Sequence, residues 1–210
     1  MSATTPGTTA TASSVPARDA THSSTPVVGY ALLLAAIGIV LDQATKVLAE
    51  RVLEGGVFVP WLGDGVGWQL VFNPGAAFGL PAPPWLFLVV TGLVVVIVAR
   101  ALPHTTGLLP ASAYGLLLSG ALGNLLDRVL RAEDGFLSGE VVDFVAWGSF
   151  PRFNLADTWI TVGFALLVVA LLLEEREADD GPDGPDGEVV TGPDAADEVR
   201  IVTDPGTSSR

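Results

Sequence analysis

Two carboxylates in the last third of the sequence, Asp143 and Asp157, are the residues most suited to chemistry. Asp143 lies between Val141-Val142 and Phe144, so it has no polar neighbour in sequence to pair with. Asp157 follows Asn154 by three residues and precedes an apolar run. Two carboxylates within hydrogen-bonding reach cannot both ionise easily, so they share a proton. One then acts as general base on a water and the other as general acid. The sequence thus suggests a dyad for peptide hydrolysis.

The sequence lacks the residues that other hydrolytic mechanisms require. The chain contains no cysteine, which excludes a disulfide scaffold, a cysteine nucleophile and thiolate metal sites. Its two histidines, His22 and His104, are far apart, so the sequence offers neither a histidine metal site nor a Ser-His-Asp arrangement. We therefore expect no metal and no cofactor, and any hydrolysis must use carboxylates.

Four apolar segments must position these carboxylates. A membrane-spanning helix needs about 20 largely apolar residues, and half of this chain is hydrophobic. The net charge of −13 is concentrated at the end, because residues 174–210 alone carry −9. We predict an all-α integral membrane fold with four transmembrane helices. Their apolar runs are 27–41 (which can extend to 48), 85–99, 107–126 and 158–173.

Polar segments flank the predicted membrane domain of residues 26–175. Residues 1–25 are rich in Ser, Thr, Ala and Pro, which predicts a disordered leader. The first apolar run ends in Leu41-Asp42-Gln43 without a small-x-small exit, so we interpret it as a retained helix. Residues 176–210 are rich in Gly, Pro and Asp and form a predicted disordered, acidic tail.

The loop between the first two spans has a different character. Residues 57–59 and 66–72 are rich in β-branched and aromatic residues, and Gly63-Asp64-Gly65 between them is typical of a turn. We predict a small β-cradle between helices 1 and 2, outside the membrane and resting on its surface. The interface suits three tryptophans of this region, Trp61, Trp68 and Trp85.

Polar residues inside apolar helices are costly and usually face one another or a cavity. Asp42 and Lys46 have the spacing of an intrahelical ion pair at the interface, which favours a structural role. Asn124, Asp127 and Arg128 share one face of the third span and form either a polar network or, for Asp127, a simple Asp–Arg pair at the helix exit.

Two further segments have both a structural and a functional interpretation. Asn73 and Gly75 lie in a segment that either turns into the second span or lets backbone pass close to another surface. Asn154 with Asp157 also fits an N-cap and an acidic first turn.

Ser119 and Gly123 have the small-xxx-small spacing of close helix contacts.

These blocks, in this order between four predicted spans, resemble lipoprotein signal peptidase, also called signal peptidase II. The resemblance covers residues 27 to about 173. The stretch 129–140 is longer than usual for this family. The matching blocks are Leu41-Asp42-Gln43-x-Thr45-Lys46, Asn73-x-Gly75-Ala76-Ala77-Phe78, Gly123-Asn124-Leu125-x-Asp127-Arg128, Val141-Val142-Asp143-Phe144 and Phe153-Asn154-x-Ala156-Asp157.

The resemblance implies a role for each polar position. Asp143 and Asp157 match the catalytic aspartates of an aspartic endopeptidase. Three positions, Asp42, Lys46 and Asp127, match residues that hold structure. The positions that match residues lining or supporting the site are Asn73, Gly75, Asn124, Arg128 and Asn154.

The resemblance also implies a substrate and a location. The substrate is a prolipoprotein carrying diacylglycerol on its cysteine, cut just before that cysteine, and the cyclic peptide globomycin blocks the site. The protein lies in the bacterial cytoplasmic membrane with both termini inside and the site near the outer face. Lipid and substrate are the expected partners, and we expect no nucleic acid.

The cations near the membrane do not themselves favour this orientation. Arg18, Arg100 and Arg176 share one side, and a larger group shares the other. The positive-inside rule would place that larger group in the cytoplasm. It comprises Lys46, Arg51, Arg128, Arg131 and Arg152. Several of these cations belong to the motifs above, so they can serve the site instead of setting topology.

Two other classes of membrane protein compete with the peptidase. A small transporter or channel subunit could use intramembrane carboxylates as proton relays. It predicts carboxylates near the middle of a helix, whereas Asp143 and Asp157 flank a span. A non-catalytic membrane scaffold has no use for the clustered Asn, Asp and Arg residues.

Overall fold

The computed structural model describes residues 25–75, 83–133 and 135–179 of the 210-residue chain. The chain divides into two compact units, Met1–Ala170 and Leu171–Arg210. Every residue of the candidate site belongs to the first unit. The predicted leader, apart from Thr25, and the predicted tail from residue 180 onward lie outside the described residues.

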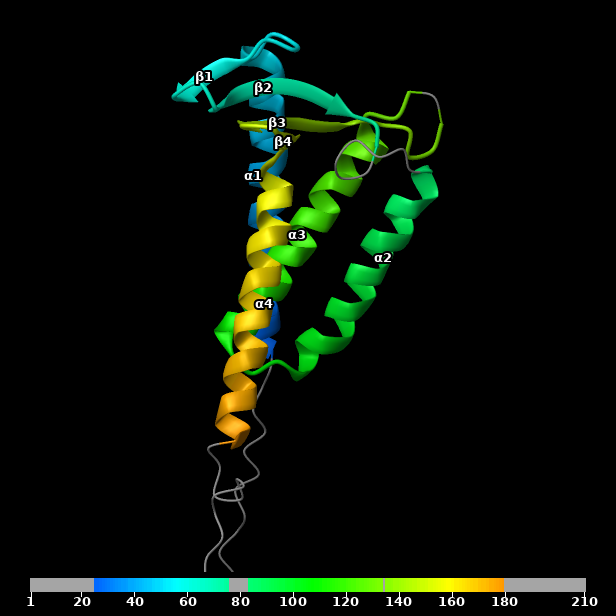
Figure 1. Ribbon diagram of the computed structural model, residues 1–210. Coiled ribbons are helices and arrows are strands. Elements are labelled where there is room, and N and C mark those ends of the chain that lie inside the picture. The colour runs from blue at the N-terminus through cyan, green and yellow to red at the C-terminus, as the bar shows by residue number, and fades with distance from the viewer. Residues whose placement is uncertain (1–24, 76–82, 134, 180–210) are drawn as a thin grey trace, which may run out of the picture. The chain divides into compact units, whose positions relative to one another are not determined.

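Four helices in the described residues are long and apolar enough to cross a membrane, as the sequence predicted (Figure 1). Each extends beyond its apolar run, because polar residues at the ends continue the helix. Pro84 begins α2 at a position where a missing N–H removes no helical hydrogen bond. A short 3₁₀ turn, η2 (Leu102–His104), connects α2 to α3. The helices are α1 (Thr25–Val52), α2 (Pro84–Ala101), α3 (Leu108–Leu130) and α4 (Leu155–Asp179).

Helix α3 packs closely against its neighbours through small residues. A Cβ added to Gly120 would lie 2.3 Å from the carbonyl oxygen of Ala156 in α4. One added to Gly123 would lie 2.7 Å from Oδ2 of Asp42 in α1. The predicted close contact at the small-residue spacing of α3 is therefore present. It brings Asp42, Gly123 and the start of α4 together.

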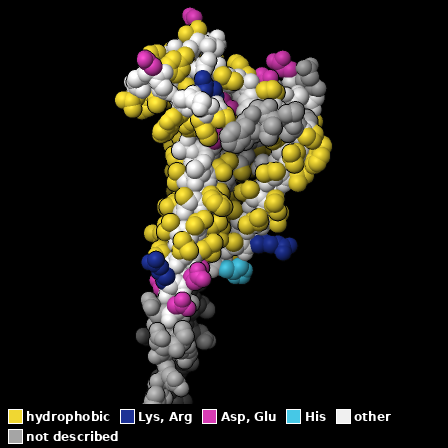
Figure 2. Space-filling view, in the orientation of Figure 1, with side chains coloured by type: hydrophobic (Ala, Val, Ile, Leu, Met, Phe, Trp, Pro, Cys, Tyr) yellow, Lys and Arg dark blue, Asp and Glu magenta, His cyan; other side chains and the backbone are white. Residues whose placement is uncertain are grey.

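Apolar side chains cover much of the outer surface of the helices (Figure 2). Leu33, Leu93 and Phe164, from three different helices, are 61%, 59% and 62% exposed. Such side chains would be unusual on the surface of a water-soluble protein in this density, but lipid solvates them. In the described residues, the buried charged side chains are Asp42, Lys46, Asp127, Arg128 and Asp143.

A four-stranded antiparallel sheet lies at one end of the helices, with its strands in the order β1-β2-β3-β4 (Figure 1). The predicted hairpin is present, with Gly63 at a φ of 62° in its turn. Its first strand begins two residues later than the predicted segment 57–59 and continues beyond it. The strands are β1 (Val59–Leu62), β2 (Val66–Asn73), β3 (Val141–Trp147) and β4 (Phe150–Phe153).

The sheet is not confined to the connection between helices 1 and 2, so that prediction was wrong. Strands β3 and β4 come from the connection between α3 and α4, so Asp143 lies within a strand and not at the end of a span. The first four residues of β3 are all buried, which removes the apolar–polar alternation that marks a half-buried strand. The register places Asp143 opposite Val71 and Val141 opposite Asn73 of β2.

Candidate active site

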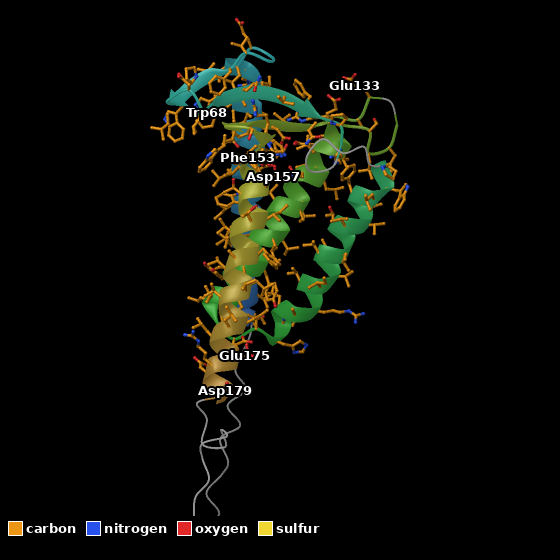
Figure 3. All side chains as sticks on the ribbon, in the orientation of Figure 1. Trp68, Glu133, Phe153, Asp157, Glu175 and Asp179 are labelled. Carbon is orange, nitrogen blue, oxygen red and sulfur yellow. The ribbon has the colours of Figure 1, made fainter. Side chains whose placement is uncertain are left out.

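Asn154 joins the two candidate carboxylates. Its side-chain Nδ2 donates to Oδ1 of Asp143 over 2.7 Å. Its backbone N–H donates to Oδ2 of Asp157 over 3.2 Å. Asp157 lies at the end of α4 nearest the sheet (Figure 3). The structure thus brings a carboxylate from β3 and one from α4 to the same asparagine.

The local geometry of Asn154 and Asp157 is that of a helix cap. The backbone N–H of Asp157 donates to Oδ1 of Asn154 over 3.0 Å, and Asp157 accepts from the N–H of Asn154 in return. This reciprocal pair satisfies two N–H groups that would otherwise have no partner at the start of α4. The predicted N-cap is therefore present, and the cap also orients Asp157. The structural and functional interpretations are compatible.

Asp143 is 2% exposed and is held on its other oxygen by Asn73. Nδ2 of Asn73 donates to Oδ2 of Asp143 over 3.0 Å. Burial raises the pKa of Asp143 to about 7; the hydrogen bond from Asn73 opposes this, and the charge of Asp157 adds to it. The partners that Asp143 lacks in sequence come from β2 and from the residue before α4.

Asn124, in α3, links Asp157 to a buried cation. Its Nδ2 donates to Oδ1 of Asp157 over 2.8 Å. Its Oδ1 accepts from Nζ of Lys46 over 3.0 Å and from Nδ2 of Asn154 over 3.1 Å. Asn124 and Asn154 therefore form one network with both candidate carboxylates.

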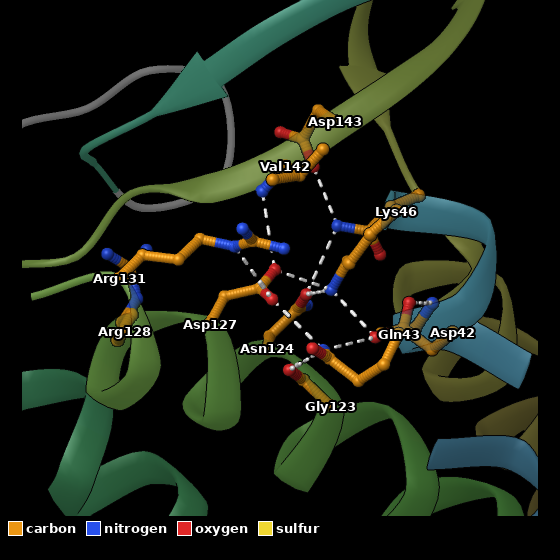
Figure 4. Close-up of polar contacts among 12 residues, drawn as sticks. Asp42, Gln43, Lys46, Gly123, Asn124, Asp127, Arg128, Arg131, Val142 and Asp143 are labelled. Atoms are coloured by element: carbon orange, nitrogen blue, oxygen red, sulfur yellow. Dashed lines mark hydrogen bonds and ion pairs between the residues drawn. The ribbon is translucent and has the colours of Figure 1, made fainter. Parts of the chain in front are cut away.

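Lys46 forms a buried ion cluster with one carboxylate of its own helix, α1, and one of α3 (Figure 4). Its Nζ lies 2.7 Å from Oδ2 of Asp42 and 2.8 Å from Oδ2 of Asp127, and all three side chains are 0% exposed. The predicted Asp42–Lys46 pair is present, and it is buried inside the protein. The pair is buried because Asp127 and Asn124 complete the coordination of the ammonium group.

Asp127 and Arg128 do not form the pair that the sequence suggested. Asp127 contacts Lys46 and Arg131, and it accepts from the backbone N–H of Val142 over 3.3 Å. Successive residues of a helix point about 100° apart, so neighbours such as these face different surroundings. Asp127 therefore ties α3 to α1 and to β3.

Arg128 is 5% exposed and contacts backbone carbonyls and an aromatic ring. Its guanidinium donates to the carbonyl oxygens of Gly75 over 2.7 Å and Gly139 over 3.4 Å. Its Cζ lies 3.4 Å from the ring centroid of Phe87 in α2. Gly139 belongs to the long stretch 129–140, so Arg128 fastens that stretch and the segment after β2 to the helices.

Asn73 and Gly75 form a tight turn at the end of β2. The backbone N–H of Gly75 donates to Oδ1 of Asn73 over 3.0 Å, which leaves the Nδ2 of Asn73 for Asp143. The segment therefore turns the chain at the end of β2 and presents the side chain of Asn73 to Asp143. Residues 76–82 lie outside the described residues.

Four residues that lie around the ion cluster and Arg128, outside the candidate carboxylate pair, were not identified from the sequence. Nε2 of Gln43 donates to Oδ1 of Asp127 over 3.0 Å, and Arg131 bridges Asp127 and Glu50. The four-residue spacing from Asp127 could have revealed Arg131, whereas nothing in the sequence marks the stacking of Phe87. In the described residues, no three His, Cys, Asp or Glu side chains gather in a way that could hold a metal ion.

Comparison with known proteins assigns the family. Residues 34–173 match the family model described as Signal peptidase (SPase) II. The chain belongs to the signal peptidase II family. It is therefore a protease, and the aspartic type follows from the family.

Relatives and solved structures agree with this family. The chain is 46% identical to the lipoprotein signal peptidase of Mycobacterium avium over 66% of its own length and 76% of the relative's. It is 42% identical to that of Mycobacterium leprae over 78% and 82%. A bacterial membrane enzyme solved by the in meso method at 2.3 Å resolution superposes with a TM-score of 0.64 at 30% identity, over 73% of this chain and 93% of that one.

Proposed function

We propose that this member of the signal peptidase II family removes signal peptides from diacylglyceryl-modified prolipoproteins by cutting just before the lipidated cysteine, with Asp143 and Asp157 as its catalytic pair. Family membership supports the removal of signal peptides from prolipoproteins. The observation that carries the assignment of residues is the sharing of Asn154 by both carboxylates. The charge of Asp157 acts on Asp143, so the two carboxyl groups titrate as a coupled pair.

The reaction needs one ionised and one protonated carboxyl group. Burial raises the pKa of Asp143 to about 7, so Asp143 holds the proton, and Asp157 acts as the base. Asp157 takes a proton from water while the oxygen of that water attacks the scissile carbonyl carbon. Asp143 gives its proton to the carbonyl oxygen, which becomes a hydroxyl group. Asp157 then protonates the amide nitrogen, Asp143 recovers its proton from that hydroxyl, and the C–N bond breaks.

The three asparagines hold the carboxylates for these steps. Asn73 and Asn154 each donate to one oxygen of Asp143, and Asn124 donates to Asp157. Hydrogen bonds to both oxygens of Asp143 leave a limited set of directions for its proton. We assign Arg128 and Gly75 to the support of this shell, because Arg128 binds the carbonyl of Gly75 and so holds the turn that carries Asn73.

The substrate is held at the membrane. Its acyl chains remain in lipid and its signal segment packs among the helices, whose exposed apolar side chains support such a contact. We place the sheet and the carboxylates at the outer face of the cytoplasmic membrane, with both termini inside. Trp61 and Trp147 of the sheet are 69% and 63% exposed, which suits the bilayer interface.

Two of the cations that oppose this orientation are accounted for by burial. Lys46 and Arg128 contact partners inside the protein and are 0% and 5% exposed. The positive-inside rule concerns cations in loops near the membrane, so these two are not evidence for a cytoplasmic site. The transporter alternative loses its support, because Asp143 lies in a strand and Asp157 in the first turn of α4.

The test is a gel-shift cleavage assay with a purified diacylglyceryl-modified prolipoprotein. Asp143→Asn and Asp157→Asn should each lower the rate by about 10²–10⁴-fold, which is the usual contribution of a general acid or base. Asp64→Asn, in the exposed hairpin turn, is the matched control and should cleave normally. A globomycin-type cyclic peptide should block the unmodified chain. Full cleavage by either aspartate variant at equal expression would remove that residue from the mechanism.

A further inference from the structure

Each asparagine of the site has its side-chain oxygen held by a hydrogen-bond donor. The backbone N–H of Gly75 donates to Oδ1 of Asn73, and the backbone N–H of Asp157 donates to Oδ1 of Asn154. An amide side chain can be turned end for end, which exchanges its donor and acceptor. A backbone N–H cannot accept a hydrogen bond, so it fixes the oxygen of each amide in place. The NH₂ group of each must then face a carboxylate.

Among the described contacts of Asn124, no backbone N–H donates to its side-chain oxygen. The ammonium group of Lys46 donates to that oxygen instead. Nζ of Lys46 lies 3.0 Å from Oδ1 of Asn124, on the opposite side of the amide from Asp157. An ammonium group has three donors and no acceptor. Asn154, whose amide is fixed by the backbone N–H of Asp157, also donates to this oxygen over 3.1 Å. Lys46 is the charged donor to the same oxygen, and a charge-assisted hydrogen bond is the stronger of the two, so Lys46 contributes most to setting the direction of Asn124.

The ammonium group is held in place by two carboxylates. Asp42 and Asp127 lie 2.7 and 2.8 Å from Nζ of Lys46, and the three side chains are 0% exposed. With Asn124 they use all three of its N–H bonds. The cluster is sealed from solvent, so the position of Nζ is fixed by the packing of α1 against α3.

We infer that Lys46 is a positioning residue of the peptidase: it fixes the Asn124 amide so that its NH₂ group holds Asp157 in the orientation that activates water. This inference rests on the proposed function. Lys46 is 0% exposed and contacts the Asn124 amide, so it is placed to act through that amide and not by touching the substrate. Its charge also opposes the rise in the pKa of Asp143, as the smallest of the effects on that group. Loss of Lys46 should lower kcat and leave KM nearly unchanged, because the substrate contacts remain.

The test must separate positioning from folding. Replacing Lys46 alone leaves two buried carboxylates without a cation. The charge-balanced variant K46M/D127N removes one positive and one negative charge, and D127N alone is its reference. Arg131→Gln is the matched control, because Arg131 also contacts Asp127 but belongs to the outer edge of the cluster, 25% exposed. All variants are made in the full chain and assayed in lipid–detergent micelles on the lipidated prolipoprotein, with the unfolding temperature measured in parallel.

We expect K46M/D127N to lose about 10- to 100-fold in kcat relative to D127N, since a small misplacement of a catalytic group costs up to that factor. KM should stay within about twofold of the reference, and Arg131→Gln should keep its kcat. Adding Asn124→Ala to K46M/D127N should lower kcat little further, although Asn124→Ala in D127N alone lowers it strongly.

Three results would overturn the inference. They are an unchanged kcat in K46M/D127N, a loss that appears in KM, or losses from Lys46 and Asn124 that multiply. If K46M/D127N loses activity and also unfolds at a much lower temperature than D127N, the comparison with Asn124→Ala in both backgrounds decides. Losses from Lys46 and Asn124 that multiply reject the positioning role, and losses that do not multiply support it. The proposed function is judged separately by Asp143→Asn and Asp157→Asn. Cleavage that needs both aspartates but not Lys46 would retain that function and reject the positioning role.

Discussion

Two buried cations stand at the end of the helices nearest the sheet, and their surroundings differ. Lys46 is enclosed by carboxylates and one amide oxygen. Arg128 is enclosed by backbone carbonyls and the ring of Phe87. A compact ammonium group suits a small cage of point charges, whereas a planar guanidinium reaches several carbonyls and stacks on a ring. Each environment therefore matches the cation it holds.

The difference separates two kinds of support for the candidate site. Lys46 acts on the side of Asp157, through Asn124. Arg128 acts on the side of Asp143, through the carbonyl of Gly75 and the turn that carries Asn73. The first cation belongs to the helix packing, and the second fastens loop segments. Changes to Lys46 should therefore affect global stability more, and changes to Arg128 should be more local.

Replacement of Lys46 alone should produce the largest loss of stability. Lys46→Met leaves Asp42 and Asp127 buried beside each other without their cation, and breaking a buried ion pair on one side costs about 3–5 kcal/mol. The measurement is the unfolding midpoint in detergent, followed by tryptophan fluorescence. K46M/D127N should recover part of the loss because it removes one of the two stranded charges. Equal stability of Lys46→Met and the unmodified chain would contradict the cage.

Arg128→Lys should have a smaller effect that is concentrated at the loops. Lysine keeps the charge but cannot reach the carbonyls of Gly75 and Gly139 together or stack as a plane on Phe87. We expect a loss of about 1–3 kcal/mol, the cost of leaving buried carbonyl partners unsatisfied, with slower cleavage. Protease nicking at the loops should increase. Arg100→Lys, at the exposed end of α2, is the matched control. An Arg128→Lys variant that matches this control in both measurements would show that charge alone suffices.

Much of the fold could be predicted because its signals are local. Four apolar runs predicted four spans, and the Gly63-Asp64-Gly65 turn predicted the hairpin of β1 and β2. Strand β3 could not be found in this way, because its buried residues lie on both faces and show no alternation. Its pairing with β2 joins residues about 70 positions apart, and no local pattern encodes such a partner.

The residues of the candidate site could be named from the sequence, but their contacts could not. The cap of Asn154 on α4 was predictable, since both residues lie within one turn. The grouping of Lys46 with Asn124, and of Arg128 with Gly75, depends on how α1, α3 and the end of β2 pack together. Sequence spacing favoured a structural role for Lys46, and the family resemblance placed Arg128 among the residues that line or support the site. In the structure Lys46 contacts an amide that holds Asp157.

Asn73→Ala should change the pH dependence of cleavage in a direction that follows from the surroundings of Asp143. The hydrogen bond from Asn73 lowers the pKa of Asp143, so its removal raises that pKa above about 7. Activity falls when Asp143 loses its proton, so the alkaline limb of kcat/KM should move to higher pH. The rate at the optimum should fall about tenfold, the effect of one hydrogen bond.

Gln69→Ala is the control for this shift. Gln69 lies on the same strand as Asn73, but its side chain contacts Arg152 and the carbonyl of Gly56. Its alkaline limb should coincide with that of the unmodified chain. A limb that moves to lower pH in Asn73→Ala would mean that the proton is not held by Asp143.

Phe87→Leu should have the smallest effect and tests what the ring adds to the surroundings of Arg128. Leucine keeps apolar packing on α2 but removes the electron-rich face that lies 3.4 Å from Cζ of Arg128. A cation–π contact contributes from about 0.5 kcal/mol at exposed sites to about 2 kcal/mol when desolvated. Arg128 is buried but Phe87 is only half-buried, so the unfolding midpoint should fall by an amount within this range and cleavage should persist. Leu88→Ala, at the neighbouring exposed position, should change neither. In an Arg128→Lys background the effect of Phe87→Leu should shrink, because the ammonium group no longer stacks on the ring. An undiminished effect there would show that Phe87 contributes by packing alone, and the two cations would then differ in their hydrogen-bond partners and not in stacking.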